Sequence, residues 1–233
     1  MPLVDNTLSK INNPLFILKK IHFFAAVLLL TFVSNLSHAQ NIEDLWIHVR
    51  NDRADQVSTL LKQGLDPNVT TDIGNPLLMQ AVRDNSWAVF DVVLKHPDTN
   101  IKITNGYQET PLMYVSLVGD LPRAKKLVEQ GATINHLGWT PLHYAASKGQ
   151  IDVAAYLLSQ GAMPNAPAPN GSSPIMMAAG AGSVDAVQLL LDRGADPAAV
   201  DINGDNAAAA ARLQGHTNLA ESLQVIIDKR QSN

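Results

Sequence analysis

The residues that could carry chemistry in this chain are its histidines. His143 follows Thr140 and Pro141, and the other histidines after residue 40 are His48, His96, His136 and His216. A helical metal site needs two ligands at positions i and i+4, often with a glutamate between them. No two of these histidines have that spacing, so the sequence predicts neither a metal site nor a bound cofactor.

Motifs for nucleophilic catalysis and for nucleotide binding are also missing. Serine, aspartate and histidine all occur, but there is no G-x-S-x-G sequence of the kind that presents a hydrolase nucleophile. Gly180-Ala181-Gly182 lacks a third glycine and a preceding strand, so we interpret it as a turn and not as a phosphate-binding loop. We therefore expect a protein that is not an enzyme.

The first forty residues differ in composition from the rest of the chain. Three lysines precede an apolar run at residues 23–33, and Ser37-His38-Ala39 follows with small residues at the positions that signal peptidase reads. This order is typical of a secretory signal peptide, and the run is shorter than the roughly 20 residues that span a bilayer. We expect a signal peptide at residues 1–39, cleavage after Ala39, and a periplasmic or secreted product.

The chain after the signal peptide is acidic and contains no cysteine. The whole sequence has 17 basic and 21 acidic residues, and the first 39 residues hold three lysines and Asp5, which leaves 14 basic and 20 acidic residues. Nucleic-acid binding depends on lysine and arginine neutralising phosphates, so we expect no nucleic-acid partner. Without disulfides, an exported domain must be stabilised by its core.

From residue 40 onwards the sequence repeats with a period of about 33 residues. The positions equivalent to Pro141 are Asp44, Leu77, Pro111, Pro174 and Ala207. In four of the six repeats a glycine stands twenty residues further on, at Gly64, Gly131, Gly161 and Gly194. A period of this length indicates a solenoid in which each unit is buried against its neighbours. We expect six units, at approximately residues 41–70, 71–103, 104–135, 136–165, 166–198 and 199–229.

The fourth unit shows the local pattern most completely. Thr140 is placed as a helix N-cap, and Pro141 occupies the first helical position, where its missing N–H is not needed. Gly149 ends this first helix, and Gly161 is placed for a left-handed cap after a second helix. Methionines occupy the place of His143 in three other units, and this regular recurrence favours core packing: they are Met79, Met113 and Met176.

On these residues the chain resembles the ankyrin-repeat family. Its signature T-P-L-H-x-A stands at residues 140–145, and weaker copies occur at 76–79, 110–113 and 173–176. The resemblance implies an all-α solenoid of about six helix-turn-helix units with short β-hairpin fingers, and it implies a structural role for His143. The atypical first and last units are expected of terminal repeats. The connector before Pro141 is three residues shorter than the next one, which predicts a truncated finger around residues 134–139.

The resemblance also implies that the concave face, made by the fingers and the first helices, holds a protein partner. The positions that we expect to bind are Arg50, Asn75, Arg83, Asp84, Tyr107, Glu109, Leu117, Trp139, Ser147 and Lys148. Further concave positions are Asn51, Ile73, Val118, Leu137, Ser172, Ile202 and Asp205. Trp139 is our first choice of anchor because aromatic side chains bury a large area at low entropic cost. Tyr114 and Tyr144 are interpreted instead as packing between units.

The sequence thus predicts a monomeric, non-enzymatic protein–protein interaction module that presents a rigid concave surface in the bacterial periplasm. A preformed surface avoids an ordering cost on binding. After removal of the signal peptide we expect no membrane contact and no cofactor. Three alternatives stay open at this point: a scaffold tethered to the membrane by an uncleaved N-terminus, a protective partner of an envelope enzyme, and an enzyme that carries none of the usual motifs.

Overall fold

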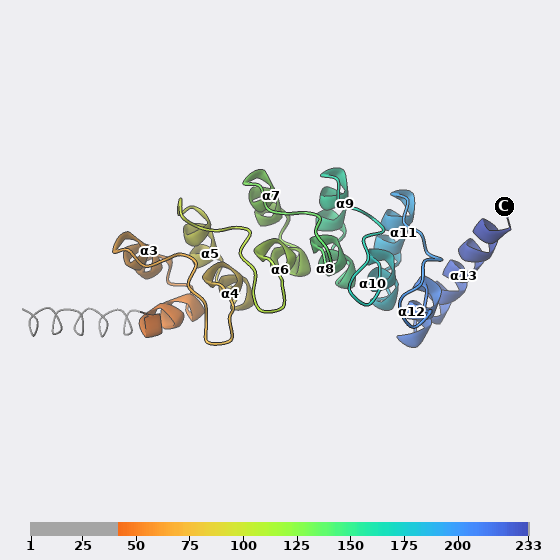
Figure 1. Cartoon of the computed structure of the whole chain (residues 1–233), viewed down its shortest axis with the longest axis horizontal. Coiled ribbons are helices and arrows are strands. Elements are labelled where there is room, and N and C mark those ends of the chain that lie inside the picture. Colours follow the sequence, from red (N-terminus) through yellow and green to blue (C-terminus); the bar gives the residue numbers. More distant parts are fainter. Residues whose placement is uncertain (1–41, 233) are drawn as a thin grey trace, which may run out of the picture.

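The structure is a computed structural model, which describes residues 42–232. The expected signal peptide lies outside the described residues. The described part is a single row of helix pairs stacked side by side, and the row bends gently (Figure 1). The helices on the inner side of the bend are residues 42–50, α4 (Leu77–Arg83), α6 (Pro111–Val118), α8 (Pro141–Ser147), α10 (Pro174–Gly180) and α12 (Ala207–Leu213).

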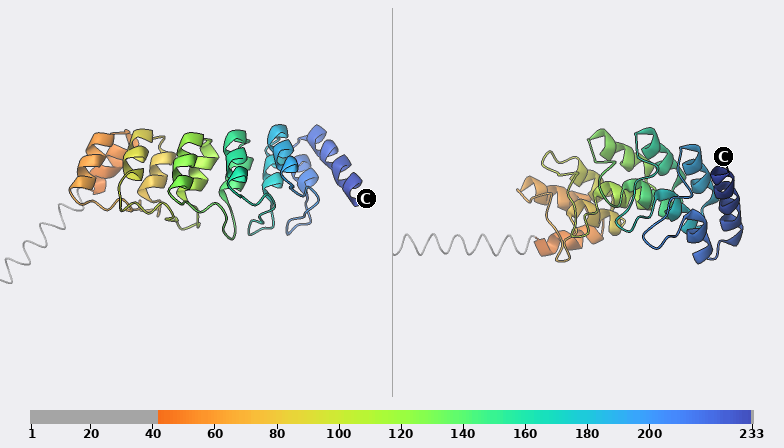
Figure 2. Two further views of the ribbon diagram at one scale, coloured as in Figure 1. Left: turned by 90° about the horizontal axis from the view of Figure 1, so that it is seen from above. Right: turned by 45° about the vertical axis from the view of Figure 1, so that its right-hand side comes forward.

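The second helix of each pair lies on the outer side of the row. These helices are α3 (Ala54–Lys62), α5 (Trp87–Leu94), α7 (Leu121–Glu129), α9 (Ile151–Ser159), α11 (Val184–Asp192) and α13 (Thr217–Gln231). The loops that join one pair to the next, called fingers below, all project from the same side (Figure 2). The sequence prediction of an all-helical solenoid is therefore confirmed.

The inner helices begin at the predicted caps. Thr140 and Pro141 stand at the N-cap and the first helical position of α8, and the same pair of roles falls to Thr110 and Pro111 in α6. The backbone N–H of Thr140 donates to Nδ1 of His143 at 3.2 Å. In α6 the N–H of Thr110 donates instead to the sulfur of Met113 at 3.3 Å. The buried methionine thus performs the capping role of the histidine.

His143 has the structural role that the sequence predicts. Its side chain is fully buried, and Nε2 lies 3.1 Å from the carbonyl oxygen of Ser172 in the next unit. Because Nδ1 accepts from the cap, Nε2 carries the proton and donates it to this carbonyl. The imidazole therefore closes its own helix and joins the fourth unit to the fifth.

The glycines that recur twenty residues after the helix starts adopt the predicted left-handed conformation. Gly64, Gly131, Gly161 and Gly194 have φ angles of 96°, 93°, 87° and 83°. Other residue types strongly disfavour these angles, so glycine at this place ends the outer helices α3, α7, α9 and α11 and turns the chain into the next finger.

The fingers follow hairpin paths, but they are closed by very few bonds. In four units one backbone N–H donates to the carbonyl four residues later, from residues 71, 105, 168 and 201. Only an isolated antiparallel bridge, between Thr70 and Pro76, is found in the described range, and no strand. Proline directly follows three of these fingers and lacks the N–H that a longer ladder needs. The fourth finger lacks the closing bond within residues 42–232, as its shorter connector predicts.

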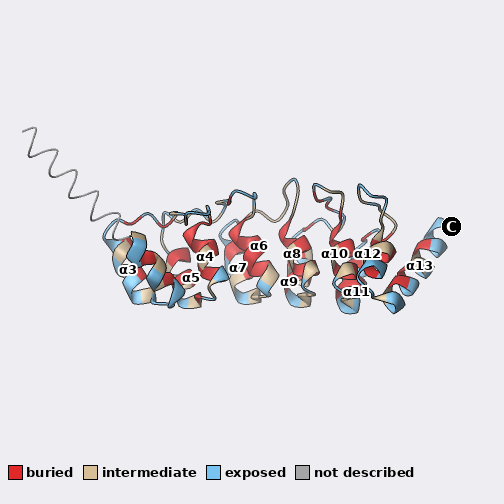
Figure 3. Cartoon of the chain, turned by 90° about the horizontal axis from the view of Figure 1, so that it is seen from below, coloured by how far each residue is buried: buried red, intermediate tan, exposed pale blue. Residues whose placement is uncertain are grey.

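The core is one continuous strip between the two rows of helices. Buried residues lie mainly on the helices where the two rows meet, and exposed residues lie mainly on the outer faces and on the fingers (Figure 3). Among the described residues, the largest side chain that is fully buried is that of Phe90 on α5, and alanines fill the close approaches between inner helices, such as Ala145 and Ala146 on α8. No helix within residues 42–232 is long and apolar enough to cross a bilayer.

Candidate functional site

The predicted binding residues lie along the fingers and inner helices, called the finger face below, but they differ in exposure. Arg50, Arg83, Tyr107 and Lys148 are exposed. The half-buried residues are Asp84, Glu109, Leu117, Trp139 and Ser147. Asn75 is only 4% exposed. The oxygen of its side-chain amide lies 3.4 Å from Nδ2 of Asn105, so Asn75 links two fingers and offers no free surface to a partner.

Part of the side chain of Trp139, the expected anchor, packs against another residue of the fold. Its ring meets the ring of His143 edge-on, with 5.3 Å between centroids and 79° between planes. An edge-to-face pair of this kind stabilises packing. The free surface of Trp139 is therefore smaller than its residue type suggests, since the residue is half-buried and its ring packs against a buried histidine.

A polar cluster occupies the middle of the finger face. The carboxylate of Glu109 accepts hydrogen bonds from the hydroxyl of Tyr114 at 2.9 Å and from Nδ2 of Asn105 at 2.7 Å. It also accepts one from the hydroxyl of Tyr144 on the following unit. Arg83, on the preceding unit, donates to the hydroxyl of Tyr114 at 3.4 Å. Two predicted residues from different units, Arg83 and Glu109, are thus coupled through the hydroxyl of Tyr114.

The electrostatics of this cluster follow from its hydrogen bonds. Burial acts to raise the pKa of Glu109, but the bonds from Tyr144, Asn105 and Tyr114 outweigh it and hold the pKa below its ordinary value. Burial and the bond to this carboxylate raise the pKa of Tyr144, and burial raises that of Tyr114. Glu109 is therefore a charged acceptor at neutral pH, and both tyrosines remain protonated donors. Tyr114 and Tyr144 were expected to pack between units, and in the structure their hydroxyls also donate hydrogen bonds to Glu109.

The tips of the fingers carry a row of exposed apolar side chains. The exposed fractions of Ile73, Tyr107, Leu137 and Ile202 are 73%, 83%, 100% and 75%. They come from the second, third, fourth and sixth units and stand at nearly the same place in each finger. Large apolar side chains that gather on a surface mark sites of interaction more often than isolated ones. All four lie among the positions that the sequence predicts for the concave face.

Grooves between neighbouring units contain several of the predicted residues. The first, of about 170 Å³, lies between the first two units and is lined by Trp46, Arg50, Thr71, Asp72, Gln80 and Asp84. Arg50 and Asp84 were predicted from the sequence, whereas Trp46 and Gln80 were not. The signal for Trp46 was weak, because the first unit lacks the Thr-Pro that fixes the register elsewhere.

The second groove, of about 360 Å³, lies between α10 and α12. Its lining contains the predicted Ser147, Ser172 and Asp205 together with Met176, Met177, Gly180, Ala181, Asp201, Ala210, Leu213 and Gln214. The sequence did not predict Leu213, which is 70% exposed although it closes an inner helix. Sequence reasoning interpreted the alanine-rich α12 only as a terminal cap.

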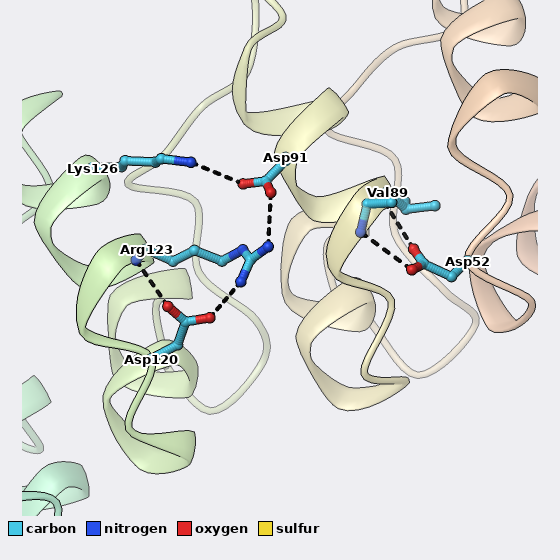
Figure 4. Close-up of polar contacts among 7 residues, drawn as sticks. Asp52, Val89, Asp91, Asp120, Arg123 and Lys126 are labelled. Atoms are coloured by element: carbon cyan, nitrogen blue, oxygen red, sulfur yellow. Dashed lines mark hydrogen bonds and ion pairs between the residues drawn. The ribbon is translucent and has the colours of Figure 1, made fainter.

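A separate charged network joins the outer helices of the second and third units (Figure 4). Arg123 on α7 pairs with Asp91 on α5 at 2.7 Å and with Asp120, the N-cap of its own helix, at 2.5 Å. Its guanidinium also lies 4.7 Å from the ring centroid of Trp87. This network lies on the outer row, away from the finger face, so we assign it to stability and not to binding.

The structure also tests the predictions about a metal site and about the turn at residues 180–182. Within residues 42–232 no group of three or more histidine, cysteine, aspartate or glutamate side chains is placed to hold a metal ion. The predicted turn around Gly182 is found between α10 and α11, and its φ of 71° fits a tight reversal of the chain.

Comparison with known proteins agrees with this geometry. A family model described as "Ankyrin repeats (3 copies)" matches residues 78–168, and one described as "Ankyrin repeat" matches residues 170–202. Together the two matches cover more than half of the chain.

Among curated relatives, similarity is confined to part of the chain. It is 31% identical over 109 residues to ankyrin repeat and SAM domain-containing protein 6 of Rattus norvegicus, covering 45% of this chain and 12% of that protein. It is 28% identical over 121 residues to neurogenic locus notch homolog protein 1 of Mus musculus, covering 51% of this chain and 5% of that protein. The chain thus spans only a small fraction of each relative.

Proposed function

The chain belongs to the ankyrin-repeat family, whose repeats are protein–protein interaction modules, and we propose that it binds a partner protein through its finger face in the bacterial periplasm. The function is that of a rigid, monomeric, non-enzymatic binding module. Binding of this kind needs no cofactor, because the side chains on the finger face contact the partner directly.

The observation that carries this proposal is the row of exposed apolar fingertips. Ile73, Tyr107, Leu137 and Ile202 come from four different units, yet they lie on one face and all are at least 73% exposed. A soluble surface rarely gathers such side chains without a use for them. The helices beneath are tightly packed, so the row is already in place before a partner arrives, and little ordering entropy is lost on binding.

Polar groups on the same face would give the binding its specificity. Arg83 and Glu109 hold fixed orientations through Tyr114, because each is hydrogen-bonded to its hydroxyl. Oriented charges at an interface favour complementary partners and disfavour partners of like charge. A partner that covers the central fingers therefore meets a charge pair flanked by apolar contacts.

Export to the periplasm is supported by the sequence of residues 1–39. Its charged start, apolar run and small residues before the cleavage point have the order of a signal peptide. The acidic chain that follows has no cysteine and so cannot form wrong disulfides in an oxidising compartment.

Site-specific photo-cross-linking in the native host tests the proposal. A photoreactive amino acid is placed at Tyr107 or Leu137 on the fingertips, and at the exposed Gln56 or Gln188 on the outer helices as controls. We expect the two fingertip positions to capture one and the same periplasmic protein, and the controls to capture none of it. Equal capture from the outer helices, or none from the fingertips of a folded protein, would contradict the proposal.

A further inference from the structure

From the groove between α10 and α12 we infer the chemistry of the partner: it presents a linear segment in which a lysine or arginine stands next to a large apolar side chain. This inference deepens the proposed function and rests on it. The groove holds about 360 Å³, a volume within the range of 300–1,000 Å³ typical of sites for small ligands. It is open along the finger face, so a chain segment can enter it sideways.

The walls of the groove are apolar. Met176 and Met177 lie on α10, and Ala210 and Leu213 lie on α12, one turn apart. Leu213 is 70% exposed, so it forms a wall that nothing in the described chain covers. Methionine side chains adapt to different shapes, which suits a site for an apolar side chain from another protein.

One edge of the groove is acidic. Asp201 and Asp205 belong to the last finger and line this edge, and the lining contains no lysine or arginine. The two carboxylates differ in their tasks. Oδ1 of Asp201 accepts hydrogen bonds from the backbone N–H groups of Asn203 at 2.8 Å and Asp205 at 3.0 Å, so this carboxylate shapes the finger.

Asp205 takes part in the finger through its backbone alone. Its N–H donates to Asp201, and its carbonyl accepts from the N–H of Asp201 at 3.0 Å. Its side-chain carboxylate is half-buried at the groove edge and is left to meet a partner. A half-buried carboxylate beside apolar walls favours a cationic neighbour, because the charge is less screened there than in open solvent.

The occupant follows from these two features together. An apolar side chain alone would pack against the walls of the groove but leave the carboxylate of Asp205 without a partner. An acidic segment would be repelled by this carboxylate. A lysine or arginine meets both needs, since its methylene stem packs on apolar surface while its head reaches the carboxylate. The adjacent apolar residue of the partner then fills the space between the methionines and Leu213.

Selection from a displayed library of random linear peptides on the purified protein tests the inference. Enriched peptides are synthesised, together with counterparts in which each lysine or arginine is replaced by glutamine or glutamate. We expect the enriched set to pair a cationic residue with leucine, isoleucine, methionine or phenylalanine. The glutamate counterparts should lose binding, and the methyl NMR signals of Met176 and Met177 should shift on titration while that of buried Met79 stays in place.

Variants locate the contact. Asp205→Asn should weaken the binding of the cationic peptides about five- to tenfold. It should weaken the binding of their glutamine counterparts far less, because only the cationic peptides use the charge of Asp205. Glu221→Gln removes the same charge from an exposed position on α13 outside the groove lining and should change nothing. Leu213→Ala should weaken both kinds of peptide, and its exposed site leaves the core intact.

The outcomes separate this inference from the proposed function. The inference is overturned if the enriched peptides are acidic, or if they leave the NMR signals of Met176 and Met177 unchanged. It is also overturned if the Asp205 and Glu221 variants lose the same affinity for the peptides, or if no peptide is enriched. The proposed function survives each of these results if fingertip cross-linking still captures one partner. It fails only if that cross-linking fails.

Discussion

The hydroxyl of Tyr144 donates a 2.5 Å hydrogen bond to the carboxylate of Glu109, 35 residues earlier in the chain. The two residues belong to neighbouring units, so the bond lies across a boundary between repeats. In a solenoid each unit contacts only its neighbours, and bonds across the boundary determine how rigidly the units align. This contact therefore connects stability to the shape of the finger face.

Replacing Glu109 tests how much this contact stabilises the stack. Glu109→Gln removes the charge that three donors share, and we expect a loss of about 1–3 kcal/mol in the free energy of unfolding, as for other hydrogen bonds to charged groups. Tyr144→Phe removes only one donor and should cost less. Urea unfolding followed by circular dichroism measures both, and equal stability of Glu109→Gln and the parent would contradict the prediction.

The buried His143 should make the fold sensitive to acid. Burial lowers its pKa from 6.5 to about 4, against the opposing effect of its bond to the Ser172 carbonyl. The unfolded chain therefore binds the proton more readily than the folded one. Stability that is fully present above pH 6.5 is lost as the pH falls towards 4, by about 3 kcal/mol in the low-pH limit.

A matched variant isolates this effect from that of other titrating groups. Met113 and Met176 already cap their helices through sulfur at the equivalent place, so His143→Met keeps a cap acceptor and cannot titrate. We expect its unfolding free energy to fall less steeply between pH 6.5 and 4 than that of the parent. Parallel pH profiles of the two proteins, measured by chemical unfolding, would show that His143 is not the source.

Arg123 should not be replaceable by lysine. Its guanidinium pairs with Asp91 and Asp120 at once and stacks over Trp87, and lysine cannot reproduce this planar, two-sided contact. We expect Arg123→Lys to lower the unfolding free energy by about 1 kcal/mol, within the usual range for loss of such contacts. Lys125→Arg on the exposed side of the same helix is the control, and a thermal melt that ranks the two variants equally would refute the assignment.

Gly171 should be far less tolerant than Gly204, although both have left-handed backbones with φ of 80° and 83°. A Cβ on Gly171 would lie 2.9 Å from the Cα of Asp201 in the next finger, whereas a Cβ on Gly204 meets nothing within 4 Å. Gly204→Ala should lower the free energy of unfolding by the roughly 1 kcal/mol expected from backbone strain alone. Gly171→Ala should lower it by more, because its Cβ would also collide with the next finger. Similar melting temperatures of the two variants would show that the fingers separate freely.

The N-terminus of the protein purified from its host tests the proposed export. If the signal peptide is removed after Ala39, the mature chain starts at Gln40, and intact-mass measurement of the periplasmic protein will show this. A protein that keeps residues before Ala39 and sediments with membranes would favour the tethered scaffold instead.

The sequence alone determined the repeat, because the features that define it are local. The cap at Thr140, the proline after it and the glycine at 161 act through the conformation of a few neighbouring residues, so their types and spacing predict the helix ends directly. The structural role of His143 could also be predicted, since the N-cap that it bonds stands only three residues away.

Which surface residues are free to bind was decided by the tertiary structure. Asn75, Trp139 and Glu109 all stand at predicted concave positions, yet each is partly or wholly engaged by residues of its own or neighbouring units. The groove beside Leu213 exists only because α12 packs on α10 across a gap of more than 25 residues in the chain. Burial and partners depend on contacts between units, and a pattern confined to one unit cannot specify them.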